Sequence, residues 1–484
     1  MQFLTWRVSL LKRLKVLLGA VVVLAACPTI RAQVSSARIS VLSLNPAKVR
    51  VEFNGSGDTS WSFRNTYATV VGLAERIENF RGHSLGREVP VRKLAPGEFR
   101  FPEAVTQVSY DVLLNPPAKR SDLSHVSWLR KEYGLLMLGD LLPTGIDTTP
   151  GLVLDFELPP HWLSASSQDS EGQRYLVSNP EQAVFVVASS LRKKTTKVGT
   201  AEIGIVTVGD WPFSDSEVSK IVMKIVAEYT RVLRHAPPKK AAVLLVPFDG
   251  VIGPERWSAE TRGRDVTLLM GQQAKPGALL ARLRVVLAHE LFHLWVPNGL
   301  TLQGDYDWFF EGFTLYQALL TGLRLQYISF EVYLQTLSRV YVSYRSSTER
   351  DKLSLLEASE RRWTASSSLV YDKGALVAFI YDLMLRRNSA GRETVSDIYP
   401  VLMQEGQGSR QDANGLLSKL LDRRPGLDRF SEEFVGSAAE IDLATFLTPF
   451  GLEVAGAGSN SRIQVSKNIN KEQRQLLKQL GFKK

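Results

Sequence analysis

Cysteine is almost absent from this sequence, and several common functional patterns are missing altogether. The 484 residues include one cysteine, so no disulfide can form within the chain and a disulfide-stapled scaffold is excluded. No internal repeat or low-complexity tract stands out. There is no Gly-x-Ser-x-Gly nucleophile elbow and no basic face typical of nucleic-acid binding. The length and the 44% hydrophobic content predict a globular chain of two or three domains.

The first 33 residues differ from the rest in charge and apolarity. They hold five basic residues and no acid, which is half of the formal net charge of +10. An apolar run follows at residues 16–26, and eleven residues rise only about 16 Å as a helix, roughly half of a bilayer core. The pattern predicts a cleaved signal peptide over residues 1–33, with an uncleaved anchor as the alternative. We therefore expect an exported protein of the bacterial periplasm or cell envelope.

The single cysteine lies at the end of this segment. Leu-Ala-Ala-Cys at 24–27 resembles a bacterial lipobox, in which Cys27 would be lipid-modified and become the first mature residue. Ordinary cleavage near Ala32 is the competing interpretation, and Pro28 directly after the cysteine is unusual for a lipobox. Both stay open, and a lipid anchor at Cys27 is the one membrane contact that the sequence suggests.

Patterning divides the remaining chain into four parts. Short strand-like runs separated by Gly, Pro and Asn turns predict a β-sandwich domain over residues 34–195. A Ser-x-x-Glu capping box at 214–217 then marks a change to helical period. Sheet-like runs continue through 196–277, and helices dominate 278–449. The last residues, 450–484, are polar and basic, and we interpret them as a tail.

Two of the six histidines lie four residues apart in His-Glu-Leu-Phe-His, residues 289–293. On a helix, residues i and i+4 face the same way. His289 and His293 can therefore bind one metal ion through their neutral imidazoles, and Glu290 lies beside them where a carboxylate can take a proton from water. The alternative is two core histidines beside an incidental glutamate. With so few histidines in the chain, chance alone rarely produces the pattern.

A catalytic zinc requires three protein ligands and one open position. The segment Asp-Tyr-Asp-Trp-Phe-Phe-Glu-Gly-Phe-Thr at 305–314 supplies the third. Glu311 opens an apolar helix that can pack on the first one, and we favour it as the ligand. Asp305 and Asp307 are the alternatives, although they are more typical of the acidic first turn of a helix.

Three segments of the sequence together resemble a known family. The motif at 289–295, the Trp-Phe-Phe-Glu-Gly-Phe-Thr-Leu-Tyr run at 308–316 and the Tyr-Asp-Lys-Gly segment at 371–374 resemble the gluzincin metallopeptidases. The chain is most similar to the glycyl aminopeptidase family and more distantly to the alanyl-type aminopeptidases. The resemblance implies a multidomain α+β fold, in which an N-terminal β-sandwich precedes a thermolysin-like zincin catalytic domain with a helical C-terminal lobe.

The resemblance also assigns roles. His289, His293 and Glu311 would bind one zinc ion per chain, Glu290 would act as general base and then acid, and Tyr371 would donate to the oxyanion. The family's Gly-Gly-Leu-Glu-His segment has its nearest counterpart at 253–258. There Glu255 could anchor the amino terminus of a substrate, and an exposed loop acid is the alternative.

The sequence thus predicts an exported zinc metallopeptidase that acts on peptide or protein substrates, and an aminopeptidase by resemblance. An endopeptidase of the same fold is the nearest alternative. A zinc hydrolase of a non-peptide bond and a catalytically silent cell-surface binding protein are the alternatives from other classes. No nucleic-acid partner is expected.

Overall fold

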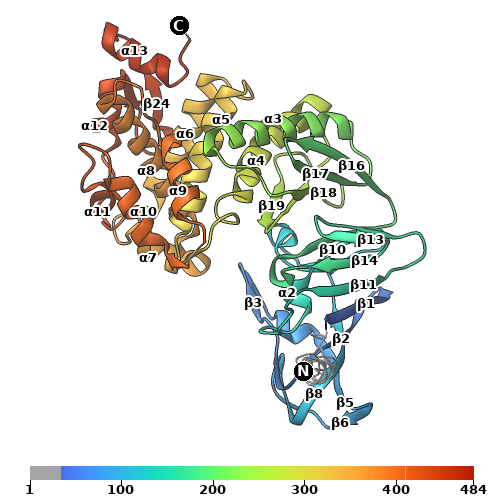
Figure 1. Cartoon of the computed structure of the whole chain (residues 1–484). Helices are drawn as coiled ribbons and strands as arrows, with labels where there is room; N and C mark the ends of the chain where they lie inside the picture. The colour runs from blue at the N-terminus through green and yellow to red at the C-terminus, as the bar shows by residue number, and fades with distance from the viewer. Residues whose placement is uncertain (1–33, 409, 484) are drawn as a thin grey trace, which may run out of the picture.

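The computed structural model describes residues 34–408 and 410–483. The expected signal peptide and Cys27 therefore lie outside the described residues. Within this part of the chain, β-sheets occupy the N-terminal half and a helical lobe the C-terminal half (Figure 1). None of its helices has the length and apolarity to cross a membrane. This arrangement confirms the predicted fold class.

The first sheet contains nine strands in the order β13-β14-β11-β1-β2-β8-β5-β6, with β7 paired to β8. Alternation of apolar and polar residues builds it: along β2, Val49, Val51 and Phe53 are buried and their neighbours are more exposed. The strand bounds are β1 (Ser35–Leu44), β2 (Ala47–Ser62), β5 (Ile77–Ser84), β6 (Arg87–Val89), β7 (Arg92–Ala95), β8 (Glu98–Leu113), β11 (Leu152–Glu157), β13 (Asp169–Glu171) and β14 (Arg174–Val177).

A second sheet of four strands is buried on both faces. Its order is β12 (Leu163–Ala165), β15 (Val184–Ala188), β10 (Tyr133–Met137) and β9 (Trp128–Leu129). In β10, Leu136 belongs to the core shared with the first sheet, whereas Leu135 and Met137 belong to a core shared with a third sheet. Strands that are covered on both faces have continuous runs of apolar residues in their sequence. This sheet is the layer that joins the first sheet to the third.

The third sheet follows the order β16 (Leu191–Val198), β17 (Ala201–Val208), β18 (Lys240–Pro247), β20 (Asp265–Met270) and β19 (Trp257–Arg262). β17, β18 and β20 are parallel, while β16 and β19 are antiparallel edges. The crossover from β17 to β18 contains α3 (Asp215–Leu233), which begins at the predicted Ser214–Glu217 capping box. The domain division that the sequence places at 195/196 falls inside β16.

The helical lobe surrounds α8 (Ser367–Asn388), which is buried without a break from Lys373 to Leu383. A helix that is apolar on all sides needs neighbours on all sides, and the rest of the lobe supplies them. The other principal helices are α4 (Pro276–Glu290), α5 (Thr314–Arg324), α6 (Phe330–Ser346), α7 (Leu355–Glu360), α9 (Tyr399–Glu405), α10 (Ala413–Asp422), α11 (Phe430–Phe434) and α12 (Leu443–Leu447).

Residues 450–483 are not a tail, which corrects the interpretation of the sequence. They form β23 (Leu452–Ala455), β24 (Arg462–Val465) and α13 (Lys471–Gln479), and their apolar residues join the core of the helical lobe. Leu476, Leu477 and Leu480 form a narrow apolar stripe on a segment that is otherwise polar. Most residues of this segment are polar, so its overall composition does not show that three leucines share one face, which is buried against the lobe.

A buried carboxylate ties the β-domain to the third sheet. Asp265 on β20 is fully buried, and its carboxylate accepts hydrogen bonds from the Ser166 hydroxyl and from the Ser167 backbone and hydroxyl, in the turn before β13. Burial raises the pKa of Asp265 to about 7, against the opposing effect of these donors.

The free energy of unfolding should therefore fall as the pH rises from about 5 to about 7. The folded state binds more protons than the unfolded state in this window, so deprotonation favours unfolding. We expect Asp265→Asn to flatten this dependence, measured by urea unfolding at intervals between pH 5 and pH 8. A slope that is the same in Asp265→Asn and the wild type would contradict the assignment.

Candidate metal and active site

Two imidazoles converge at the end of α4. The helix tightens after Glu290 into a 3₁₀ turn, η4 (Leu291–Leu294), and the Nε2 atoms of His289 and His293 lie 3.1 Å apart. Nδ1 of His293 lies 2.8 Å from the carbonyl oxygen of Val296. A proton on Nδ1 satisfies that carbonyl, so the lone pair of Nε2 is left to face His289.

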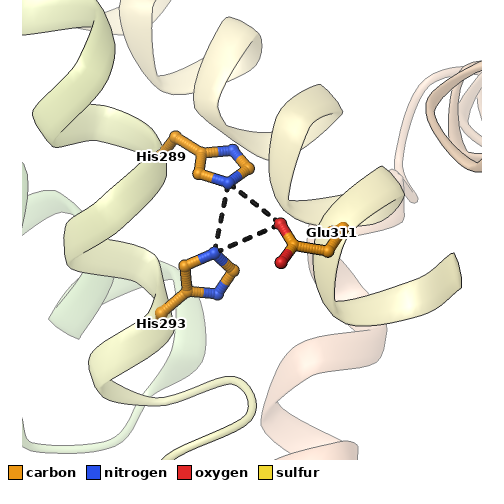
Figure 2. A group of neighbouring side chains, drawn as sticks. All are labelled: His289, His293 and Glu311. Carbon is orange, nitrogen blue, oxygen red and sulfur yellow. Dashed lines mark hydrogen bonds and ion pairs between the residues drawn. The ribbon is translucent and has the colours of Figure 1, made fainter. Parts of the chain in front are cut away.

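Glu311 completes the group from a second element. It lies in a π-helical turn, η5 (Trp308–Phe313), which continues as α5. Its Oε2 is 3.2 Å from Nε2 of His289 and 3.5 Å from Nε2 of His293. Figure 2 shows the two rings and the carboxylate pointing at one another across the gap between the two helices. Single π-turns inside helices are frequent at functional sites.

The spacing of these three atoms fits a zinc ion. Ligands about 2.0–2.1 Å from a tetrahedral zinc lie roughly 3.3 Å from one another, and the three separations here are 3.1, 3.2 and 3.5 Å. Two imidazole nitrogens and a carboxylate are also the ligand chemistry that zinc prefers. The alternative carboxylates lie outside the group: Asp305 is exposed, and Asp307 forms an ion pair with Arg362.

The carboxylate of Glu311 is held as an anion. Its side chain is buried, and burial alone would raise its pKa. The Arg362 guanidinium, whose Nη2 lies 2.7 Å from Oε1, and the two imidazoles outweigh that effect and hold the pKa of Glu311 well below its usual range. Glu311 thus presents Oε2 to the histidines and Oε1 to an arginine that the sequence did not single out.

Two glycines let Tyr371 approach the cluster of His289, His293 and Glu311. Where η5 crosses α8, a Cβ on Gly374 would lie 2.6 Å from the carbonyl oxygen of Trp308 and 3.0 Å from Cα of Gly312. Only glycine permits so close a crossing. It places Tyr371, one turn before Gly374 on α8, with its ring centroid 6.3 Å from that of His289 and its hydroxyl 2.9 Å from Arg362.

Glu290 is held by a residue of the neighbouring sheet. Its side chain is buried, and the Thr261 hydroxyl on edge strand β19 lies 2.9 Å from both its carbonyl oxygen and its Oε2. One face of β19 therefore borders the motif helix. A hydroxyl that anchors one carboxylate oxygen leaves the other available for proton transfer.

The opposite face of β19 is attached to the N-terminal half. Glu260 receives hydrogen bonds from the Tyr67 hydroxyl and pairs with Nδ1 of His125 at 2.9 Å and with Nε of Arg262 at 3.1 Å. These partners hold the pKa of Glu260 at about 2 although burial would raise it. Ser258, two residues earlier, lies 2.6 Å from Ser124 of the 3₁₀ helix η2 (Arg120–Ser124). The β-domain thus fixes the strand that positions Glu290.

The structure brings together five predicted residues and leaves one apart. His289, Glu290, His293, Glu311 and Tyr371 meet at the junction of α4, η5 and α8, as described above. Glu255 lies on an exposed turn between β18 and β19, outside the metal-binding cluster, and its role toward a substrate amino terminus stays a prediction.

Sequence reasoning missed Arg362 and Thr261. Neither carries a motif signal of its own, since each acts on a residue distant in the chain.

A His-Glu-x-x-His helix joined by a glutamate from the next helix, on a mixed sheet beside a helical lobe, defines the gluzincin class of zinc peptidases. Residues 282–377 match the family model of the M61 glycyl aminopeptidases, and this range contains all five of the residues that the structure brings together. No curated protein sequence matches the chain.

Solved structures share the architecture at low sequence identity. An aminopeptidase N family protein from Idiomarina loihiensis is 19% identical with a TM-score of 0.76, over 87% of this chain and 79% of that one. The M1 zinc metallopeptidase of Deinococcus radiodurans is 14% identical with a TM-score of 0.53, over 85% and 95% of the two chains. These likenesses establish the fold.

We expect protein purified from residue 34 onward to contain about one zinc per chain, measured by elemental analysis. Glu311→Ala should lose most of it, because two imidazoles alone leave the site one ligand short. Asp305→Ala is the matched control and should keep its zinc, since this exposed carboxylate lies outside the group. Equal zinc in Glu311→Ala and the wild type would contradict the ligand set.

The glycine crossing can be tested by adding one methyl group. Gly374→Ala should destabilise the fold by about 1–3 kcal/mol and reduce zinc content, because the added carbon collides with η5. Gly277→Ala in the first turn of α4, where a Cβ would meet nothing within 4 Å, is the control. Thermal unfolding and elemental analysis of both variants check this, and indistinguishable results would contradict the packing argument.

Proposed function

We propose that the protein is an exported zinc metallopeptidase that removes amino-terminal residues from peptides. The observation that carries the proposal is the convergence of Nε2 of His289, Nε2 of His293 and Oε2 of Glu311 within 3.1–3.5 Å of one another, with a buried general base next to them. One zinc ion held by these atoms would polarise the scissile carbonyl and lower the pKa of the attacking water.

Glu290 is the group that moves protons. Its buried carboxylate accepts the proton of the attacking water and returns it to the leaving amine. The Thr261 hydroxyl holds Oε2 and the backbone carbonyl of the same residue, which fixes the rotamer of the base before substrate arrives. A positioned base is effective because its geometry requires no reorganisation during the reaction.

Tyr371 faces the same space from α8. Its phenol can donate a hydrogen bond to the oxygen that gains negative charge when water adds to the carbonyl. Burial raises the pKa of Tyr371 well above its ordinary value, so the phenol keeps its proton at neutral pH. Proton transfer and oxyanion stabilisation therefore come from two different elements, the motif helix and α8.

Preference for amino termini is supported by similarity. The matched family is described as glycyl aminopeptidases, and a variant of the Deinococcus radiodurans metallopeptidase has been solved with a Tyr-Ser-Ala substrate. Glu255 is exposed on its turn and Glu260 faces the β-domain, and neither is assigned to the substrate amino group. The anchor for a substrate amino group thus stays open in this proposal.

Aminoacyl-amide substrates with a free and with an acetylated amino group provide the test. We expect hydrolysis of the free form alone, and a fall of about 10²–10⁴-fold in kcat/KM in Glu290→Gln with zinc content unchanged. Glu255→Gln should leave the rate close to that of the wild type. An unstructured protein serves as the endopeptidase substrate.

Each outcome separates the candidate activities. Release of internal fragments only, or equal rates for free and acetylated substrates, would overturn the aminopeptidase assignment in favour of an endopeptidase. Turnover of esters without any peptide hydrolysis would favour a non-peptide hydrolase. A cleaved precursor in the periplasmic fraction would support export, whereas an intact cytoplasmic chain would contradict it.

A further inference from the structure

A buried arginine links the third metal ligand to the oxyanion donor. Arg362 opens the π-helical segment η6 (Arg362–Ser366) that leads into α8, and it is 8% exposed. Nη2 lies 2.7 Å from Oε1 of Glu311 and 2.9 Å from the hydroxyl of Tyr371, while Nη1 pairs with Asp307. One guanidinium therefore contacts residues of two helices that meet at the site.

The surroundings of this arginine hold it in one orientation. Its guanidinium carbon lies 4.3 Å from the ring centroid of Trp363, 5.6 Å from that of Phe310 and 5.5 Å from that of Tyr371. Aromatic faces and two carboxylates leave a planar guanidinium few alternative positions. Its Nε, by contrast, has no hydrogen-bond partner among the described residues, a cost that a purely space-filling side chain would avoid.

The contact with Glu311 selects the oxygen that faces the metal position. Oε1 is occupied by Arg362, and Oε2 is the oxygen that lies 3.2 Å from His289 and 3.5 Å from His293. A carboxylate free to rotate would offer either oxygen or both. The arginine also balances the buried negative charge of Glu311, so the net charge of the site as a whole is less negative.

The contact with Tyr371 sets the direction of its hydrogen bond. An N–H of Arg362 donates to the phenol oxygen, because a guanidinium has donors and no acceptor. The phenol keeps its own proton, which can point toward Glu311 in this structure or toward a substrate oxygen, and a phenol oxygen that already accepts a charged donor becomes a stronger donor itself. This is the behaviour required of an oxyanion donor.

We propose that Arg362 is a positioning residue that presents Oε2 of Glu311 to the metal and turns the hydroxyl of Tyr371 toward the substrate oxyanion. This inference rests on the proposed function, and it adds a residue that contacts neither metal nor substrate. It explains why a buried charge with an unpartnered N–H lies in the segment between η5 and α8.

Metal affinity tests the first half without any catalytic assay. Zinc affinity would be measured by competition with a chromophoric chelator for wild type, Arg362→Gln, Arg362→Lys and Arg361→Gln. We expect Arg362→Gln to bind zinc about 10- to 100-fold more weakly. Arg362→Lys should show an intermediate loss, because lysine keeps the charge without the fork. Arg361→Gln, at the exposed neighbouring position, should match the wild type.

A double-mutant cycle tests the second half. With zinc saturating, Arg362→Gln and Tyr371→Phe should each lower kcat with KM little changed, since both act on the transition state. If Arg362 acts through Tyr371, the double variant should lose little more than Tyr371→Phe alone. Fully multiplicative losses would show that the arginine does not act through the phenol.

The outcomes distinguish this inference from the proposed function. Unchanged zinc affinity in Arg362→Gln together with multiplicative kinetic losses would overturn the inference and leave a zinc peptidase intact. Zinc binding that weakens in Arg362→Gln, in a wild type that cleaves no peptide, would support the role toward Glu311 and overturn the peptidase. No zinc binding by the wild type would overturn both. Arg362→Lys keeps the test decisive if Arg362→Gln fails to fold.

Discussion

The buried negative charge of Glu311 is the constraint around which the catalytic half is organised. An unpaired carboxylate at this depth would cost more than the fold could sustain. It is stabilised from two sides, by the imidazoles of His289 and His293 on one oxygen and by Arg362 on the other. The crossing of η5 and α8 at Gly312 and Gly374 brings these partners within reach of one another. Loss of any one of them would leave the buried charge less fully compensated.

The β-rich half has a structural connection to the same site. Its second sheet shares one core with the first sheet and another with the third, so the layers form a continuous stack. The β-domain also forms hydrogen bonds and ion pairs with one face of strand β19, at Ser258, Glu260 and Arg262. On the other face of this strand, Thr261 forms a hydrogen bond with Glu290. The general base is therefore positioned by contacts that reach across the domain boundary, and rigidity of that boundary bears directly on the proposed chemistry.

Two buried acids near the domain boundary, Glu260 and Asp265, have pKa values that are shifted in opposite directions. Around Glu260, opposite charges and a tyrosine hydroxyl compensate one another and hold the carboxylate ionised. Asp265 accepts its hydrogen bonds from serines, and these donors and the nearby charge of Arg264 are too weak to offset burial, which raises its pKa to about 7. The two acids lie five positions apart in the chain and on adjacent strands. Their opposite behaviour follows from the strength of the positive charge that opposes burial: Glu260 pairs directly with Arg262 and His125, whereas Arg264 has only a small effect on Asp265.

Local patterns determined a large part of this protein. The i, i+4 histidines, the neighbouring glutamate, the Ser214–Glu217 capping box and the strand-to-helix change of period all follow from rules that act within a few residues. Glu311 and Tyr371 were reached by ligand chemistry and by resemblance. Only the tertiary structure placed Arg362, Thr261 and the glycine crossing, because their partners lie 9 to 66 positions away along the chain. It also placed the last residues in the core, since packing partners cannot be read from local composition.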